Sequence, residues 1–238
     1  MLPDILANAK AVMSGQPLVT ASEANPITEW EGMRRGKFTA SRIADLCTKS
    51  RNGQEMGKTA MSYIYEVLGE QLGDIEDNYV SKEMQYGIDN EPVAAQLIAE
   101  KYPDFQYLGT TFFPHPEFGH ISGASPDGMI GTDTVVEIKT LYTTRKYLEC
   151  LSFERSKDVL SAAKDYYYQV QMQIACTGAK EGLLMFFNPR FLGTFNEHRA
   201  IHPILIPRDE EVIEDIRISI MGGIAHLNFL KRRFALTK

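Results

Sequence analysis

Two carboxylates and one lysine stand at a spacing that suits metal-assisted chemistry on a phosphate ester. Asp127 lies in Ser125-Pro126-Asp127-Gly128, and ten residues later Glu137 and Lys139 flank Ile138. Carboxylate oxygens hold hard cations such as Mg²⁺, which keeps several waters and binds phosphate oxygens. Such an ion polarises the ester and acidifies a bound water, and a second ion stabilises the leaving oxygen. A lysine beside it can orient or deprotonate that water and offset developing charge.

The residues around this pair predict a β-strand over 134–140. Side chains alternate along a strand, so Glu137 and Lys139 share one face while Val136 and Ile138 share the other. A Gly-rich connection to the preceding strand brings Asp127 beside the pair. The bare spacing also fits a turn Asp and a cross-strand ion pair with no chemical role. The Ser-Pro-Asp-Gly flank and the otherwise apolar strand favour the site, because a charged pair buried without partners is costly.

The predicted elements follow the order helices, three strands, helices, two strands and a final helix. A Pro interrupts a backbone hydrogen bond and clashes with the preceding turn, so Pro92 should kink or divide its helix. Residues 15–29 read as a loop. The periodicity predicts helices near 2–13, 41–46 (capped by Thr39 or Ser41), 61–68, 81–101, 144–150, 156–176 and 209–233, and strands near 107–113, 119–123, 134–140, 183–187 and 201–206.

The length of 238 residues fits a single domain. The order of elements indicates an α/β class, with an α+β mixed sheet flanked by helices. We expect an N-terminal helical extension over 1–29, a core over 30–206 and a C-terminal helix over 207–238. Neither GxGxxG nor GxxxxGK[ST] occurs, so nucleotide binding of those kinds has no support. No apolar run reaches the length of a membrane span, and we expect a cytoplasmic protein with no membrane partner.

Charge is distributed unevenly. The net charge is −6, yet residues 34–58 hold seven Lys and Arg against two Asp and Glu, which makes this segment +5 and the remainder −11. Such a segment can hold a phosphate backbone locally, although it also fits a solvated basic helix face. The three cysteines, Cys47, Cys150 and Cys176, are too far apart for a zinc motif, and their odd number excludes a disulfide framework.

Four blocks, in order over residues 30–190, resemble the phage lambda exonuclease or YqaJ-type viral recombinase family of the PD-(D/E)xK nuclease superfamily. The first, Trp30 to Ser41, is similar to the family's W-x-x-x-R-x-G-x-x-T-A-S. The second has Gly87 and Glu91 at G-x-x-x-E spacing. The others are Ser125-Pro126-Asp127-Gly128 with Glu137-Ile138-Lys139, and Tyr168-Gln169-Val170-Gln171 followed by Asn188-Pro189-Arg190. The resemblance implies a restriction-endonuclease-like core with helical additions at both ends.

The resemblance also implies residue roles. Asp127, Glu137, Glu91 and the backbone carbonyl of Ile138 would bind metal, and Lys139 with Gln169 would complete the catalytic group. A second set, Arg34, Ser41 and Ser125, would grip the 5′-phosphate, Arg51 would contact DNA, and Met84 would wedge open the terminal base pair. Two features depart from related patterns: Pro92 directly follows Glu91, and Gln173 stands where a Q-x-x-x-Y motif has Tyr.

By this resemblance the chain is a Mg²⁺-dependent 5′-to-3′ double-strand DNA exonuclease that binds two ions, accepts Mn²⁺ in their place and releases mononucleotides. It would form a homotrimeric ring in the cytoplasm of a bacterial host, as a phage or prophage protein, and pass its 3′ overhang to a single-strand annealing recombinase. Two alternatives stay open: a RecB-like, Cas4-like or structure-specific endonuclease with the same metal core, and a non-catalytic DNA-end-binding accessory protein. A metal pair at His198 and His202 is disfavoured, because Pro203 and its apolar neighbours predict a strand.

Overall fold

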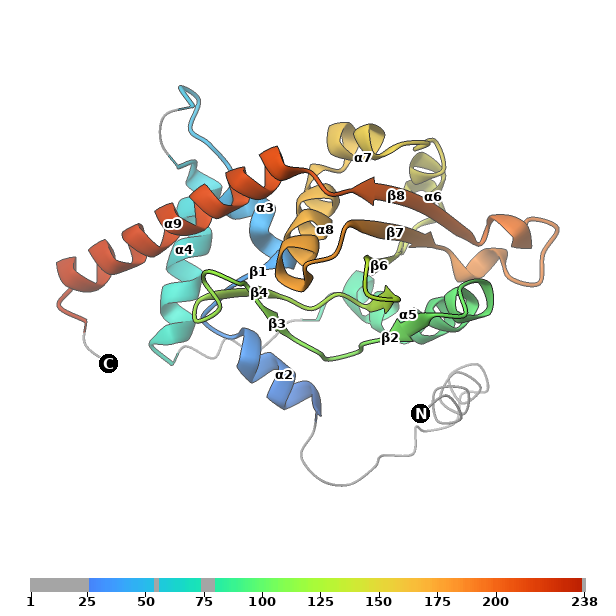
Figure 1. The fold of residues 1–238 in the computed structure, drawn as a ribbon, viewed down its shortest axis with the longest axis horizontal. Coiled ribbons are helices and arrows are strands. Elements are labelled where there is room, and N and C mark those ends of the chain that lie inside the picture. Colours follow the sequence, from blue (N-terminus) through green and yellow to red (C-terminus); the bar gives the residue numbers. More distant parts are fainter. Residues whose placement is uncertain (1–25, 54–55, 74–79, 237–238) are drawn as a thin grey trace.

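A computed structural model describes residues 26–53, 56–73 and 80–236 (Figure 1). None of the described helices is long and apolar enough to cross a membrane. The helices are α2 (Pro26–Arg34), α3 (Ile43–Leu46), α4 (Lys58–Gln71), α5 (Lys82–Lys101), α6 (Thr144–Cys150), α7 (Ser156–Ala162), α8 (Lys164–Thr177) and α9 (Glu210–Arg233), with short 3₁₀ turns at Ala40–Arg42, Pro189–Phe191 and Glu197–Arg199.

The strands form two sheets. The larger sheet has the order β2-β5-β6-β7-β8, and the smaller has the order β1-β4-β3. The bounds are β1 (Phe38–Thr39), β2 (Phe105–Tyr107), β3 (Phe113–Pro114), β4 (Ser122–Ala124), β5 (Gly128–Ile130), β6 (Thr134–Thr140), β7 (Glu181–Phe187) and β8 (Ile201–Pro207). In the larger sheet β6 and β7 are parallel, whereas the other neighbours are antiparallel. Strand β6 therefore lies at the centre of the larger sheet.

The two faces of β6 differ in character. Val136 and Ile138 are buried and pack against one side of α5 through residues such as Ala94 and Ile98. The other face is covered by α8, which lies so close to β7 that a Cβ at Gly182 would collide with the side chain of Val170. Helix α8 is thus the element that encloses the polar side chains of β6.

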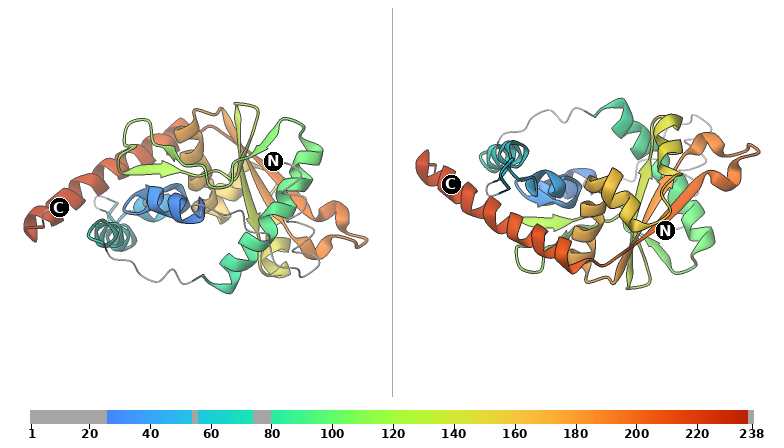
Figure 2. Two further views of the ribbon diagram at one scale, coloured as in Figure 1. Left: turned by 90° about the horizontal axis from the view of Figure 1, so that it is seen from below. Right: turned by 90° about the horizontal axis from the view of Figure 1, so that it is seen from above.

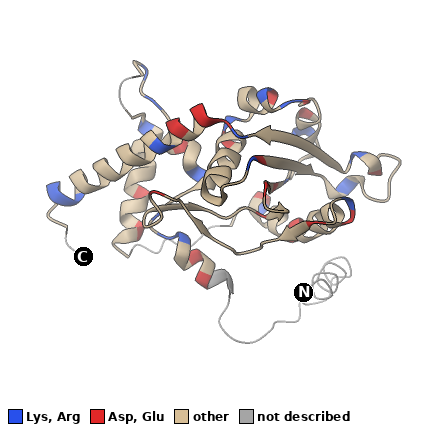
Figure 3. Ribbon diagram, in the orientation of Figure 1, with Lys and Arg blue, Asp and Glu red and all other residues tan. Residues whose placement is uncertain are grey.

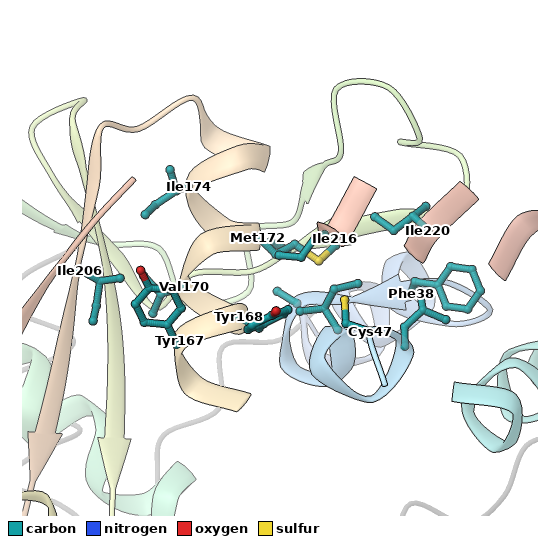
Figure 4. Close-up of a cluster of buried hydrophobic side chains, with 14 of the residues drawn as sticks. Phe38, Cys47, Tyr167, Tyr168, Val170, Met172, Ile174, Ile206, Ile216 and Ile220 are labelled. Atoms are coloured by element: carbon teal, nitrogen blue, oxygen red, sulfur yellow. The ribbon is translucent and has the colours of Figure 1, made fainter. Parts of the chain in front are cut away.

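Helix α8 also joins the larger sheet to the N-terminal helices. Figure 4 shows Val170 directed toward Ile206 of β8, whereas Met172 lies near Ile216 of α9. Eight successive residues of this helix, from Tyr167 to Ile174, are buried. Because both sides of α8 pack against other elements, its polar side chains are held in a fixed environment.

The smaller sheet brings distant segments together. Strand β1 pairs in parallel with β4, so that Phe38 lies opposite Ser122. The chain leaves β4 at Ala124 and enters β5 at Gly128, which is part of the larger sheet. The intervening residues 125–127 therefore link the two sheets.

The expected fold class is confirmed: a mixed α/β structure with mixed sheets flanked by helices. The helices expected over 144–150 and 209–233 and the strands over 134–140, 183–187 and 201–206 agree with α6, α9, β6, β7 and β8 to within two residues. Helix 2–13 lies outside the described residues. Of the kink or division expected at Pro92, division is wrong, because α5 runs continuously through this residue. One lost N–H is tolerated where Ala94, Ala95 and Ile98 bury the following turns.

Other expected boundaries need correction. The loop expected over 15–29 is wrong at its end, because α2 begins at Pro26. The strand over 107–113 is replaced by β2 and β3, which belong to different sheets, and the strand over 119–123 begins only at Ser122. The Gly-rich connection contains the short strand β5. The helix over 156–176 is two helices, since Ala163 has the non-helical angles φ −143° and ψ 56°.

Candidate active site

Glu137 and Lys139 lie on the α8 face of β6 and share a buried hydrogen-bond triangle with Gln169. Glu137 is only 4% exposed. The Nε2 of Gln169 donates to Glu137 Oε1 at 2.6 Å, and Lys139 Nζ lies 2.8 Å from that same oxygen. Lys139 also donates to Gln169 Oε1 at 2.9 Å. Each member therefore holds the other two in place.

Gln173 completes this arrangement and was not assigned a role from the sequence. Its Nε2 donates to Glu137 Oε2 at 2.5 Å, and its own Oε1 is buried without a hydrogen-bond partner. Gln169 and Gln173 are one turn apart on α8, so they reach the two oxygens of one carboxylate. The available signal was the pair of amides at i, i+4 in a helix that is otherwise largely apolar or aromatic.

Asp127 reaches β6 from the link between the sheets. Its Oδ2 accepts a hydrogen bond from the backbone N–H of Ile138 at 2.6 Å. Gly128 follows because the Phe105 ring occupies the space that a Cβ there would need. Burial raises the pKa of Asp127 well above its usual value, and the nearby charges of Glu137 and Glu91 raise it further.

Glu91 approaches from α5. Its Oε1 accepts a hydrogen bond from the Tyr107 hydroxyl at 2.8 Å. Burial raises the pKa of Glu91, and repulsion from Glu137 adds to that shift, while the Tyr107 bond opposes it. Burial pulls the pKa of Lys139 down, but attraction to Glu137 outweighs that pull, so its pKa is raised and it carries a positive charge at neutral pH.

The donor set fits a hard divalent cation that is only partly enclosed by protein. The charge of Glu137 helps to raise the pKa values of Asp127 and Glu91, and a bound cation would relieve this cost of their ionisation. Within the described ranges no group of three or more His, Cys, Asp and Glu is arranged to enclose an ion by itself. Mg²⁺ is usually bound in this partial way, with water and substrate phosphates filling the remaining positions. A divalent metal is therefore compatible with these residues.

A second polar group lies beside the carboxylates. Arg34 of α2 donates to Ser41 Oγ at 3.1 Å and stacks over the Trp30 ring at 4.4 Å. The Trp30 indole N–H donates to Ser125 Oγ at 2.9 Å. Burial lowers the pKa of Arg34, whereas the charges of Tyr63, Glu137 and Asp127 act against that shift. The structure thus brings together the three residues expected to grip a phosphate, with Trp30 as an additional member.

The remaining expected residues do not join these two groups. Arg51 is exposed in the turn before Gly53, and Met84 is 57% exposed in the first turn of α5. Ile88, one turn after Met84, is equally exposed. His202 lies in β8, as the strand prediction required, and its Nε2 bonds the carbonyl of Phe153, whereas His198 belongs to a separate 3₁₀ turn.

Comparison with known proteins connects this geometry to a family. The family model described as a YqaJ-like viral recombinase domain matches residues 29–180. An alkaline exonuclease from Laribacter hongkongensis has a similar structure, with 26% identity and a TM-score of 0.68 over 87% of this chain and 98% of that one. Its complex with dAMP gives 27% identity and a TM-score of 0.69 over the same shares.

A phage-related exonuclease from Haemophilus somnus 129PT shares the fold, with 15% identity and a TM-score of 0.64 over 83% of this chain and 96% of that one. Among curated proteins, none matches the chain. The family match covers more than half of the residues and includes Arg34, Glu91, Asp127, Glu137 and Lys139. The expected resemblance is confirmed, and the chain belongs to the family of the YqaJ-like viral recombinase domain.

Proposed function

We propose that this chain is a Mg²⁺-dependent 5′-to-3′ exonuclease of double-stranded DNA that works in recombination. The observation that carries the proposal is the position of Ser125 and Asp127, two residues apart in the link between the sheets. Ser125 contacts Trp30 and so belongs to the phosphate-gripping group, by which we mean Arg34, Ser41, Ser125 and Trp30. Asp127 belongs to the carboxylate group through Ile138. A site that grips a strand end beside a phosphoester-cleaving centre suits an exonuclease.

The side chains divide the work between them. Asp127, Glu137, Glu91 and the Ile138 carbonyl would hold two Mg²⁺ ions, for which Mn²⁺ can substitute. When bound, the ions would supply a Lewis acid and acidify a water at the phosphate. Lys139 carries a positive charge, so it would orient the attacking water and offset charge on the phosphate oxygens. Gln169 holds the Lys139 ammonium and the Glu137 carboxylate in register. Arg34 offers a bidentate fork to the 5′-phosphate, with Ser41 and Ser125 as further donors.

The proposal extends to DNA contacts and partners. Arg51 would contact the duplex backbone, and the exposed Met84 would press against the terminal base pair. The whole chain 1–238 would act as one nuclease domain, assembled as a homotrimeric ring in the cytoplasm of a bacterial host. Its 3′-ended product would be taken up by a single-strand annealing recombinase.

One digestion experiment tests the central proposal. Linear duplex with 5′-phosphate ends, the same duplex with 5′-hydroxyl ends and closed circular plasmid are each incubated with Mg²⁺. We expect mononucleotides from the phosphorylated ends, slower release from hydroxyl ends and no cutting of the circle. Cutting of the circle would instead indicate an endonuclease with the same metal core. Absence of any metal-dependent release would indicate a non-catalytic end-binding protein.

A further inference from the structure

The first half of helix α5 contains no residue buried deeply enough to hold it in place. The buried residues of α5 are Ala94, Ala95 and Ile98, all in its second half. Residues 82–90, all of which the structure describes, are exposed or only partly buried. Figure 2 shows the later turns of α5 against the larger sheet, whereas its first turns extend to the edge of the molecule. The position of this first half therefore depends on the other contacts that it makes.

Tyr86 supplies those contacts. Among the hydrogen bonds, ion pairs and ring contacts of the described residues, those that join residues 82–90 to another element all involve the Tyr86 ring. This ring meets Tyr142 edge-on, with the two ring centroids 5.4 Å apart. The guanidinium of Arg190 lies over the Tyr86 ring, 4.8 Å from its centroid. An aromatic face attracts a cation at this distance, so Arg190 ties the first half of α5 to the rest of the protein.

Arg190 is itself held at the carboxyl ends of β6 and β7. Its Nη1 donates to the Tyr142 carbonyl at 2.8 Å, and its backbone N–H donates to Asn188 Oδ1 at 3.1 Å. Asn188 directly follows β7 and is fully buried. In Figure 3 the segment between β7 and β8, to which Arg190 belongs, carries basic residues. Arg190 forms no salt bridge within the described ranges, so its charge is left to the rings of the two tyrosines.

The cluster of Tyr86, Tyr142 and Arg190 connects two parts of the proposed site. Tyr142 comes shortly after Lys139, just beyond the end of β6. Tyr86 comes two residues after Met84, and two residues of an α-helix turn a side chain by about 200°. Tyr86 therefore faces the rest of the protein, while Met84 points away from it and is 57% exposed. The cluster thus fixes the exposed side of α5 relative to the strand that carries Lys139.

We propose that Arg190 is a positioning residue for the opening of the duplex end, and that through Tyr86 it sets the place of Met84 relative to the metal-binding carboxylates. The inference rests on the proposed function, because it takes Met84 as the side chain that presses against the terminal base pair. Pairing and stacking resist the removal of a base from the duplex. The helix that carries Met84 must therefore be held firmly, whereas an end that is already unpaired needs no such support.

The first test compares two duplex ends that differ only in whether they are paired. Both carry the same 5′-phosphorylated strand, and in one of them the complementary strand is mismatched at the terminal base pairs. Release of the first nucleotide is measured in Mg²⁺ under single-turnover conditions. Arg190→Gln removes the guanidinium, Tyr86→Leu removes the ring and Tyr86→Phe keeps the ring. Arg199→Gln removes an exposed cation from the same segment and is the matched control, and thermal unfolding checks that each variant is folded.

We expect Arg190→Gln and Tyr86→Leu to slow release from the paired end about 10- to 100-fold and to leave release from the mismatched end within about threefold of the unmodified chain. Tyr86→Phe and Arg199→Gln should match the unmodified chain at both ends. Met84→Ala should show the same selective loss, and combining it with Arg190→Gln should add little, because both changes act on one step. Equal slowing of Arg190→Gln at both ends, or no slowing at either, overturns the proposal.

Hydrogen exchange measures the contact of Arg190 with α5 without any cleavage. The amides of residues 82–90 should exchange faster in Arg190→Gln than in Arg199→Gln, because loss of the contact favours local opening of the helix. Unchanged exchange overturns the positioning role of Arg190. An unmodified chain that releases no nucleotide from either end overturns the proposed function, and hydrogen exchange distinguishes that result from a failure of the Arg190 contact.

Discussion

The carboxylate centre lies beside the group of Arg34, Ser41 and Ser125, which we propose grips the 5′-phosphate, but the two groups are built differently. Glu137 is buried, and both of its oxygens accept hydrogen bonds from side chains of α8. Ser41 is exposed, and Arg34 reaches it through one bond of 3.1 Å. Groups that carry out chemistry gain from being held in advance, whereas a grip must stay open to its ligand. The two groups should therefore respond differently to substitution.

The largest expected effect is at Lys139. Lys139→Ala should lower single-turnover cleavage on the order of a thousandfold or more, since it removes a charge that acts on the transition state. Affinity for 5′-phosphorylated duplex in Ca²⁺ should change by no more than a few-fold. The control is Lys180→Ala, whose ammonium pairs with Asp133 at the surface. Retained turnover in Lys139→Ala would contradict the assigned role.

The next effect concerns Gln173 and compares two buried amides of α8. Gln173→Leu should lower cleavage about 10- to 100-fold and raise the Mg²⁺ concentration needed for half-maximal rate, because Glu137 loses a partner that orients it. Gln171→Leu also loses buried bonds, to the Pro207 carbonyl and the Asp209 N–H, but touches no carboxylate of the site. It should lower the melting temperature without moving the Mg²⁺ dependence. Equal Mg²⁺ shifts in both variants would reduce Gln173 to a structural residue.

A third effect isolates the grip. Arg34→Ala should reduce the preference for 5′-phosphate over 5′-hydroxyl ends about 10- to 100-fold, which is the usual value of charge-assisted hydrogen bonds. Arg34→Lys should restore little, because an ammonium cannot replace the planar fork. Arg42→Ala, which breaks pairs with Asp45 and Glu66 nearby, is the matched control. An unchanged ratio in Arg34→Ala would move the end grip elsewhere.

The smallest effect is on stability in the absence of metal. The pKa values of Asp127 and Glu91 are raised in the folded protein, so folding favours their protonated forms. That stability is present below the ordinary carboxyl pKa and is lost as pH rises through the raised values. The melting temperature in EDTA should therefore fall as pH rises through this window, and added Mg²⁺ should raise the melting temperature most at pH values above the window. Asp127→Asn should weaken the pH dependence; protection that is the same at every pH would argue against carboxylate repulsion.

The sequence was most informative where a local pattern determines structure. Period-two alternation in Thr134–Thr140 located β6 and correctly separated Glu137 and Lys139 from Val136 and Ile138. The alternation did not indicate that β2 and β3 belong to different sheets. Which strands pair is set by tertiary contacts, as in the pairing of β1 with β4 through Phe38 and Ser122. The sequence also did not indicate that Gln173 contacts Glu137, because the hydrogen bonds of a buried amide depend on which side chain faces it in the fold.

The link Ser125-Pro126-Asp127 fixes the distance between the two groups. Two residues of extended chain span at most about 7 Å, and Pro126 restricts the backbone between them. Under the proposed function Ser125, at one end of this link, contacts the terminal phosphate, and Asp127, at the other end, lies at the phosphate to be cut. The length of this link would then determine the length of the product. A residue inserted into the link should change the size of the fragment released more than the rate of its release.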